Sequence, residues 1–410
     1  MVEYKGDVVI IGAGRSGRGL HGEFCFKDGW RITFADIDRE LIRKMRAQGS
    51  YTSFSEKDGA EGFEECVVSG YRALHIVDDR PEYIDALAYA DIIFTATFDD
   101  AFESIVCDIK DALDRKIELG LEKQFALVVG ANYVGLYDYF SAAFAREFDS
   151  DERRWFDRFG VLAESIIYRV SSFPNEEQKA RDELSVQNDS FAVLQVNTGQ
   201  FARADKIEKP GFFQDEDDTL RFMHCKIWNI NTAHCSLAFL GQYYGCACIC
   251  DAANDNYISR VSYLSSVEAY AGLAKRYDLP DEPDRESERA LWGWYRDRTM
   301  LDTVERVGND PIRKLRRNDR FIGPALNCMK YDILPVHICQ NAAYGFFFHN
   351  EGDARTDRMA ARIASEGIEQ TIQQVCGLDI EKSDERVVFE LILSKYRDLA
   401  DVNPLDKLLA

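Results

Sequence analysis

The run Asp7–Ile11 and the glycines that follow it constrain the fold of this chain more than any other feature. A short β-branched run leads directly into Gly12-Ala13-Gly14-Arg15-Ser16-Gly17, and we expect a helix to begin immediately afterwards. In such a Gly-x-Gly-x-x-Gly pattern, the first glycine allows a tight turn, the second lets a pyrophosphate approach the backbone, and the third lets the helix pack closely against the strand. The pattern predicts a dinucleotide site at a helix N-terminus.

An acidic residue follows the glycines at the spacing that such a site requires. A second strand-like run ends at Asp36, nineteen residues after Gly17. A carboxylate there accepts hydrogen bonds from the adenosine ribose hydroxyls, and its charge disfavours a 2′-phosphate, so we expect NAD as cofactor. The structural alternative is that Asp36 only caps the next helix together with Asp38. The predicted cofactor-binding residues are Gly12, Gly14, Gly17, Asp36, Thr95 and Thr97.

The pattern of apolar residues changes along the chain and predicts two domains. The first 170 residues alternate short β-branched runs with amphipathic stretches, which is typical of a parallel sheet covered by helices. Beyond about residue 200, long helical periods dominate, and the turn and acidic run within Lys206–Asp218 mark the expected boundary. We expect residues 1–205 to form an NAD-binding α/β domain of Rossmann type. We expect residues 206–410 to form a mainly α-helical domain for substrate binding and catalysis.

A lysine, an asparagine and a histidine interrupt the otherwise apolar helix that we expect over Thr219–Leu240, closed by Gly241. At 100° per residue, Asn231 and His234 lie near 140° and 80° from Lys226, within one sector of the helix. A partly desolvated lysine has a lowered pKa and can act as a general base, while Asn231 and His234 can hydrogen-bond the same reacting oxygen. The structural alternative is a solvated lysine with two satisfied polar side chains at a domain interface.

These residues also carry a resemblance to a known family. The motif Lys226-x4-Asn231-x2-His234, together with the blocks Val304–Leu315 and Asn318–Pro324, resembles the polyol-specific long-chain dehydrogenases. The resemblance implies a Rossmann-type domain, a helical C-terminal domain and a catalytic cleft between them. It also implies a metal-independent reaction in which Lys226 is the acid/base and nicotinamide takes or gives a hydride.

The same resemblance implies a substrate and further contacts to it. The expected activity is NAD-dependent interconversion of a polyol phosphate and a ketose phosphate, of the mannitol 1-phosphate and fructose 6-phosphate type. By motif matching, Asn132, Arg306 and Lys314 are expected to contact the substrate.

Several pocket positions depart from the family pattern. Ala131, Tyr168 and His224 stand where the family commonly has acidic residues or close to such positions. These changes leave the proton and hydride chemistry intact but remove polar contacts to a hexitol. Two alternatives therefore stay open: the same chemistry on a non-phosphorylated polyol or hexuronate, and an NAD-responsive binding protein without catalysis.

Charge composition limits the partners. Fifty Lys and Arg residues against 71 Asp and Glu give a net charge of −21, which disfavours nucleic acids and anionic membrane surfaces. The apolar runs are too short to span a bilayer, so we expect a cytoplasmic protein, as a monomer or small homo-oligomer, whose partner is a small polyol or sugar phosphate.

The cysteines do not suggest a disulfide scaffold or a metal site. Their number, 11, is odd and the chain is long, so we expect reduced thiols. On a helix through Cys246-Ala247-Cys248-Ile249-Cys250, Cys246 and Cys250 would share a face and Cys248 would point away. No Cys or His pair follows at zinc-finger spacing, and we expect buried, reduced thiols without a bound metal.

Overall fold

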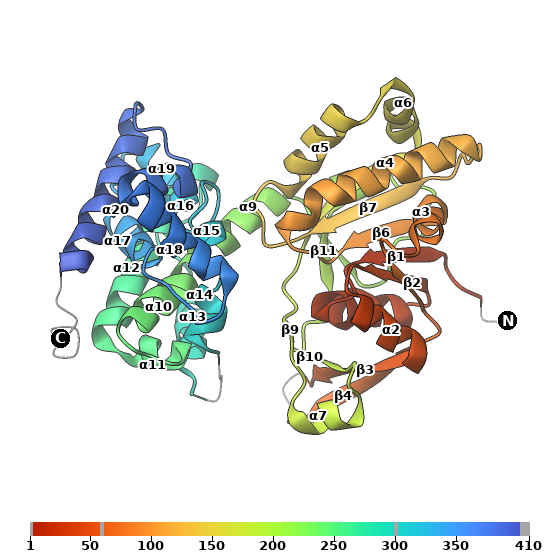
Figure 1. Ribbon diagram of the computed structural model, residues 1–410, viewed down its shortest axis with the longest axis horizontal. Coiled ribbons are helices and arrows are strands. Elements are labelled where there is room, and N and C mark those ends of the chain that lie inside the picture. The colour runs from red at the N-terminus through yellow and green to blue at the C-terminus, as the bar shows by residue number, and fades with distance from the viewer. Residues whose placement is uncertain (1–2, 58–60, 299–301, 402–410) are drawn as a thin grey trace. The chain divides into compact units, whose positions relative to one another are not determined.

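The chain folds into two units, which we call unit 1 (Met1–Thr219) and unit 2 (Leu220–Ala410) (Figure 1). The computed structural model describes residues 3–57, 61–298 and 302–401. Lys206–Asp218, expected as a turn between domains, contains a strand, β12 (Phe213–Glu216), which pairs in parallel with β11 (Leu194–Asn197). That pairing keeps the segment within unit 1.

Unit 1 is built on an eight-stranded sheet in the order β12-β11-β8-β7-β6-β1-β2-β5 (Figure 1). Its other strands are β1 (Asp7–Ile11), β2 (Arg31–Asp36), β5 (Arg72–His75), β6 (Ile92–Thr95), β7 (Phe125–Gly130) and β8 (Gly160–Ile166). These six strands are parallel, and β11 runs antiparallel to β8. Because β1 lies between β2 and β6, the direction in which strands are added reverses at β1, and ligands of such sheets bind beside the carboxyl ends of the strands at this point.

Both faces of the sheet are covered by apolar side chains. Val8 and Ile10 point into one core and Val9 and Ile11 into another, because successive strand residues face opposite sides. The first core includes residues of α1 and α2, and the second includes residues of α3, α4 and α5. The helices of unit 1 are α1 (Glu23–Lys27), α2 (Arg39–Gln48), α3 (Arg80–Tyr89), α4 (Phe102–Glu118), α5 (Leu136–Glu147), α6 (Ser150–Phe159), α7 (Glu176–Arg181) and α8 (Thr198–Phe201).

A second, four-stranded sheet was not anticipated from the sequence. Its order is β4-β3-β10-β9, formed by β3 (Ser50–Glu56), β4 (Phe63–Ser69), β9 (Ser171–Ser172) and β10 (Val186–Asn188) (Figure 1). A buried ion pair connects this sheet to α1: Arg169 donates to Glu23 at 2.8 Å, and Ser53 on β3 donates to the same carboxylate at 2.7 Å. Both charged side chains are at most 2% exposed.

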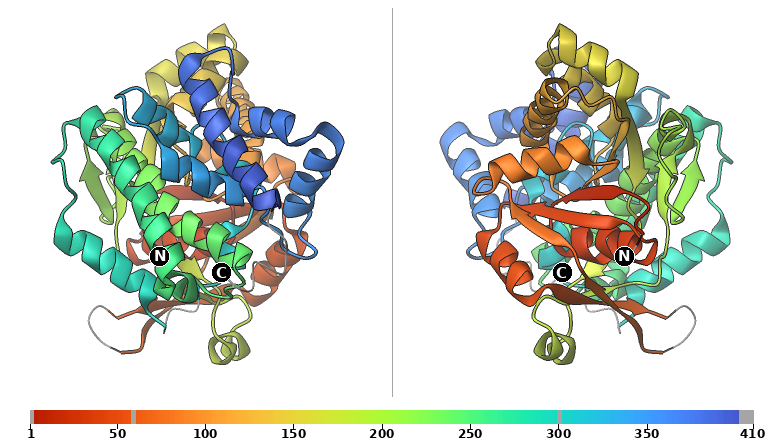
Figure 2. Two further views of the ribbon diagram at one scale, coloured as in Figure 1. Left: turned by 90° about the vertical axis from the view of Figure 1, so that its left-hand side faces the viewer. Right: turned by 90° about the vertical axis from the view of Figure 1, so that its right-hand side faces the viewer.

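Unit 2 is helical, with one hydrophobic core. The long helix α12 packs against α10, α16 and α17, and α20 lies along α17 (Figure 2). The prediction of a Rossmann-type α/β domain followed by a mainly helical domain is confirmed. Within the described ranges, no helix combines the length and apolar character needed to cross a membrane. The helices that follow α9 (Thr219–Cys225) are α10 (Asn231–Tyr243), α11 (Ile249–Asn254), α12 (Asn256–Tyr277), α13 (Arg285–Arg296), α14 (Val304–Gly308), α15 (Pro311–Lys314), α16 (Ile322–Met329), α17 (Val336–Tyr344), α18 (Ala354–Glu366), α19 (Ile368–Cys376) and α20 (Ser383–Asp401).

The helix expected over Thr219–Leu240 is present, but it is not α-helical throughout and it does not end at Gly241. It consists of α9 (Thr219–Cys225), a π-helical segment (Lys226–Ile230) and α10. A Cβ at Gly241 would lie only 3.0 Å from side-chain atoms of Ala252 and Val304, so this glycine allows close packing inside α10. The chain turns away at Gly245, whose φ of +82° suits glycine.

The cysteine-rich segment differs from its prediction. All eleven cysteines fall in the described part of the chain and are free thiols. Helix α11 begins only at Ile249, and Cys248 precedes it in an extended conformation. Cys248 therefore turns toward Cys250, and the expectation that it points away from Cys250 is wrong.

The buried Glu23–Arg169 pair generates a stability prediction. Arg169→Met removes one of two cations from the buried Glu23 carboxylate and leaves only Lys27, at 2.7 Å and 42% exposed. We expect the unfolding free energy of unit 1 to fall by about 3 kcal/mol in urea denaturation, because the buried half of the pairing is lost. The double variant with Glu23→Gln should recover part of this loss, because no buried carboxylate then remains and Lys27 is partly exposed to solvent. Arg181→Met is the matched control: its pair with Glu65 is about half exposed, and its loss should cost about 1 kcal/mol or less. Equal effects of the Arg169 and Arg181 variants would contradict the assignment.

Candidate active site

The glycine turn of unit 1 has the geometry that its sequence predicts. Gly12 adopts a φ of +99°, and a Cβ on Gly17 would lie 1.9 Å from the Gly12 carbonyl oxygen, so only glycine fits at the start of the helix. A Cβ on Gly14 would meet nothing within 4 Å. The space beside Gly14 is thus open, as an approaching pyrophosphate requires.

Asp36 lies against this turn. Its Oδ2 accepts a hydrogen bond from the Ala13 backbone N–H at 2.6 Å, and its Oδ1 accepts one from the N–H of Asp38 at 2.9 Å. The cap of α2 itself is Asp38, which accepts from Leu41. Asp36 therefore connects the end of β2 to the glycine turn and does not itself cap the helix.

The two threonines predicted for the cofactor differ in their surroundings. Thr95 is 1% exposed, and its hydroxyl accepts a hydrogen bond from Gly130 N–H at 3.2 Å, so it connects β6 to β7 inside the sheet. Thr97 lies next to Gly12, with its methyl group 3.2 Å from where a Gly12 Cβ would stand. The buried Thr97 Oγ1 has no hydrogen-bonding partner in the described structure, which suits a ligand contact. Asn132 is exposed on the loop beyond the carboxyl end of β7.

In unit 2, Lys226 begins the π-helical segment, and this changes its relation to Asn231. The backbone N–H of Asn231 donates to the carbonyl oxygen of Lys226, a bond that spans five residues. Such a turn holds more residues than the 3.6 of an α-helix, so Asn231 lies closer to the direction of Lys226 than the 140° predicted for a uniform helix. Single-turn π segments are frequent at functional sites.

Burial and a neighbouring cation together change the acidity of Lys226. Desolvation, with the charge of Arg320 second, lowers the pKa of Lys226 from 10.5 to about 8. Arg320 is 7% exposed and donates to Asp319 at 2.5 Å. Arg320 was not predicted as a site residue, although it stands six residues after Lys314, which was.

His234 is held by aromatic rings and a carboxylate. Its ring stacks on Tyr295 at 5.1 Å and meets the edge of Trp294 at 5.6 Å. Burial lowers the pKa of His234 in spite of Asp302, so the imidazole is neutral near pH 7. His234 Nε2 lies 3.2 Å from Asp302 Oδ2, but the two are not aligned as a hydrogen bond.

Arg306 and Lys314, predicted as one pair of substrate cations, have unlike environments. Arg306 is exposed and donates twice to Asp302, each bond 2.5 Å long. Lys314 is 5% exposed, and desolvation, followed by the charge of Arg320, lowers its pKa to about 7. The charge of Arg320 thus contributes to the lowered pKa values of Lys226, His234 and Lys314. Sequence reasoning missed Asp302, whose only signal was its position four residues before Arg306.

Two positions that depart from the family pattern are occupied by packed side chains. His224 Nδ1 lies 2.5 Å from the Tyr277 hydroxyl, and its ring contacts that of Trp228 at 3.8 Å. Tyr168 contacts the ring of Phe191 at 5.6 Å.

Comparisons with known proteins match both units. Residues 6–209 match the model of the mannitol dehydrogenase Rossmann domain, and residues 218–403 match that of the mannitol dehydrogenase C-terminal domain. Mannitol 2-dehydrogenase of Pseudomonas fluorescens, solved as a ternary complex with NAD and D-mannitol, is similar with a TM-score of 0.77 and 15% identity, covering 99% of this chain and 94% of that one.

Two further solved structures share the fold. A D-sorbitol dehydrogenase, solved without substrate, has a TM-score of 0.60 and 14% identity, covering 96% of this chain and 94% of that one. Octopine dehydrogenase, solved with NADH and pyruvate, has a TM-score of 0.53 and 11% identity, covering 85% of this chain and 91% of that one. Since the two family models together match nearly the whole chain, the protein belongs to the mannitol dehydrogenase family of nicotinamide-dependent polyol dehydrogenases.

Proposed function

We propose that this protein is an NAD-dependent dehydrogenase that interconverts the secondary alcohol of a polyol phosphate with the ketone of a ketose phosphate. The observation that carries the proposal is Lys226, partly buried in a π-helical segment, with a pKa of about 8 and with Asn231 one π turn further along. The residues around Lys226 resemble those of mannitol-1-phosphate 5-dehydrogenases. Mannitol 1-phosphate and fructose 6-phosphate are accordingly the proposed substrate pair.

The glycine turn supports nicotinamide-dinucleotide binding. The open space beside Gly14 would receive the pyrophosphate, and the orphaned hydroxyl of Thr97 would gain a partner. The carboxylate of Asp36, held at Ala13 N–H, would accept from the ribose hydroxyls and repel a 2′-phosphate, which favours NAD over NADP. When bound, the nicotinamide ring supplies the acceptor or donor of the hydride.

Lys226 is proposed to move the proton. Near pH 8, the Lys226 amine is neutral in about half of the protein molecules. It can therefore remove the hydroxyl proton during oxidation and return it during reduction. Asn231 and the neutral His234 would hydrogen-bond the same oxygen as it changes between alcohol and carbonyl. Asp302 holds Arg306 and contacts His234, which makes it a positioning residue for this step.

Buried cations support an anionic substrate. Lys314 and Arg320 lie inside unit 2, where a phosphate would meet them in surroundings of low dielectric.

A second candidate, the same chemistry on a non-phosphorylated polyol or hexuronate, is favoured by a specific observation. Arg320 and Arg306 already donate to Asp319 and Asp302, so much of the local positive charge is compensated.

Substrate assays separate the two candidates. With NAD, mannitol 1-phosphate should give a kcat/KM at least about tenfold above that of free mannitol, since charge-assisted hydrogen bonds contribute about 1.5–3 kcal/mol. Lys314→Met should reduce this preference more than it reduces turnover of the free polyol. Good turnover of a free polyol or hexuronate, with none of either phosphate, would establish the second candidate. If the alcohols with NAD form no NADH and the ketones with NADH consume none, both candidates are contradicted.

Removal of the proposed base tests the mechanism. Lys226→Ala should lower kcat by roughly 10²-fold or more, the usual contribution of general acid–base catalysis, while NADH binding is retained.

In the wild type, kcat/KM for alcohol oxidation should rise with pH and level off above about pH 8, because only the neutral amine accepts a proton. The kcat/KM for ketone reduction should fall above that pH, because only the charged amine donates one. Both dependences should disappear in the variant. Lys275→Ala, on exposed α12 surface, is the control. Full activity of Lys226→Ala would refute the mechanism.

A single methyl group tests the cofactor assignment. Gly14→Ala fits without a clash in the free protein, so its melting temperature should stay unchanged. The added methyl group stands where a pyrophosphate must approach, and NADH affinity should fall by about tenfold, the equivalent of one hydrogen bond of about 1.4 kcal/mol. Fluorescence titration with NADH measures the change. Gly293→Ala, at an equally open position on α13, should bind NADH like the wild type.

A further inference from the structure

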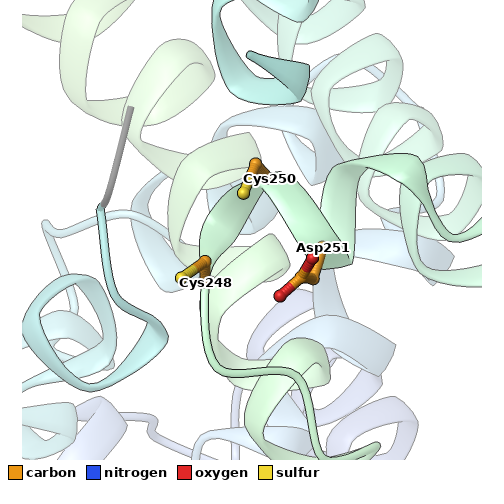
Figure 3. Close-up of side chains that lie close together, drawn as sticks. All are labelled: Cys248, Cys250 and Asp251. Carbon is orange, nitrogen blue, oxygen red and sulfur yellow. The ribbon is translucent and has the colours of Figure 1, made fainter. Parts of the chain in front are cut away.

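Two cysteines and an aspartate gather at the start of α11 (Figure 3). Within the described ranges, the Sγ atoms of Cys248 and Cys250 and a carboxylate oxygen of Asp251 all lie within 4.8 Å of one another. Cys250 is buried, while Cys248 and Asp251 are partly exposed, so the group has access to solvent. None of these residues belongs to the catalytic set proposed above.

Local backbone structure explains why the three side chains meet. Cys248 is the N-cap of α11 and is extended, with φ −119° and ψ 155°. Asp251 occupies the third helical position, and an N-cap side chain and the side chain at that position face each other across the first turn. Cys250 lies between them on the same turn. The arrangement is therefore determined by the helix start at Ile249.

A second segment holds this conformation in place. Ile249 N–H donates to Asp302 O at 2.8 Å, and Val304 N–H donates to Ala247 O at 3.1 Å. Cys248 thereby forms an antiparallel bridge with Thr303. The backbone at the two cysteines is thus held in place by this second segment. Thr303, which pairs with Cys248, is adjacent to Asp302, the residue that contacts His234.

From this geometry we infer that Cys248, Cys250 and Asp251 form a binding site for a thiophilic d10 cation such as Zn²⁺ or Cd²⁺. Two thiolates and a carboxylate are a donor set that zinc accepts, with a fourth position left for water. Around a tetrahedral ion with Zn–S bonds of about 2.3 Å, two sulfur atoms stand about 3.8 Å apart, so the separation of the two sulfur atoms needs to contract by roughly 1 Å or less.

The carboxylate of Asp251 is available to such an ion. Its present partner is Arg298, at 3.2 Å, with the arginine side chain 70% exposed and the aspartate 40% exposed. An exposed ion pair of this kind contributes little stability, so a cation can replace it at small cost. On binding, the two thiols lose their protons to solvent and the ion forms bonds to both sulfur atoms, with no change in oxidation state.

Titration of the reduced full-length protein with Cd²⁺ tests the site, because cadmium–thiolate bonds give a charge-transfer absorption in the ultraviolet. In the wild type, this band should saturate at one equivalent of Cd²⁺. Zn²⁺ in excess should abolish the band, because it displaces Cd²⁺ from the site. Cys248→Ser and Cys250→Ser should each weaken binding by at least about tenfold, since even groups that only support a metal ligand contribute that much. Cys246→Ser, two residues away and outside the group, should behave like the wild type.

Thermal unfolding provides a readout that is independent of catalysis. Zn²⁺ should raise the melting temperature of the wild type and of Cys246→Ser by mass action, but not that of the double variant Cys248→Ser/Cys250→Ser. Equal melting temperatures of all variants without metal would show that the substitutions preserve the fold. A wild-type band that persists in the double variant, or no band at all, would overturn the proposal. So would a Cys248–Cys250 disulfide formed with peroxide in a protein that binds neither metal.

Discussion

The nucleotide-binding half of this protein depends on one steric constraint, the contact between Gly17 and the carbonyl oxygen of Gly12. A Cβ at Gly17 would lie 1.9 Å from that oxygen, so the helix can begin directly at the end of β1 only because no side chain is present. The turn also continues the sheet, since Gly12 N–H donates to Ala35 O and Ala96 N–H donates to Ile11 O, each at 2.7 Å. These bonds place Asp36 and Thr97 beside the turn.

The helical half depends on cations inside an acidic protein. The net charge of −21 describes the whole chain, yet Lys314 and Arg320 are at most 7% exposed. Desolvation, with the charge of Arg320 second, lowers the pKa of Lys314 to about 7 and that of Lys226 to about 8. The same burial that disfavours charge on a lysine makes it able to exchange a proton near neutral pH. The burial of these cations opposes folding, and the same burial supports the proposed proton transfer.

Asp302 connects two features of unit 2 that are far apart in the sequence. Its carboxylate binds Arg306 and contacts His234, while its carbonyl accepts the hydrogen bond from Ile249 at the start of the cysteine group. One residue therefore contacts a proposed catalytic side chain and holds the backbone beside the thiols. No periodic pattern signals such a role, because it arises from pairing between segments that are more than fifty residues apart.

The sequence alone determined the features that depend on neighbouring residues: the strand and glycine turn at Asp7–Gly17, the alternating core, and the order of an α/β half and a helical half. Spacing also predicted that Lys226, Asn231 and His234 form one group, although a uniform α-helix would place Asn231 too far from the direction of Lys226. Tertiary structure decided the rest. The second sheet, the burial of Arg320 and the backbone that brings Cys248 to Cys250 involve contacts between distant segments. Local propensity carries no information about such contacts, because their energies exist only when the chain has folded.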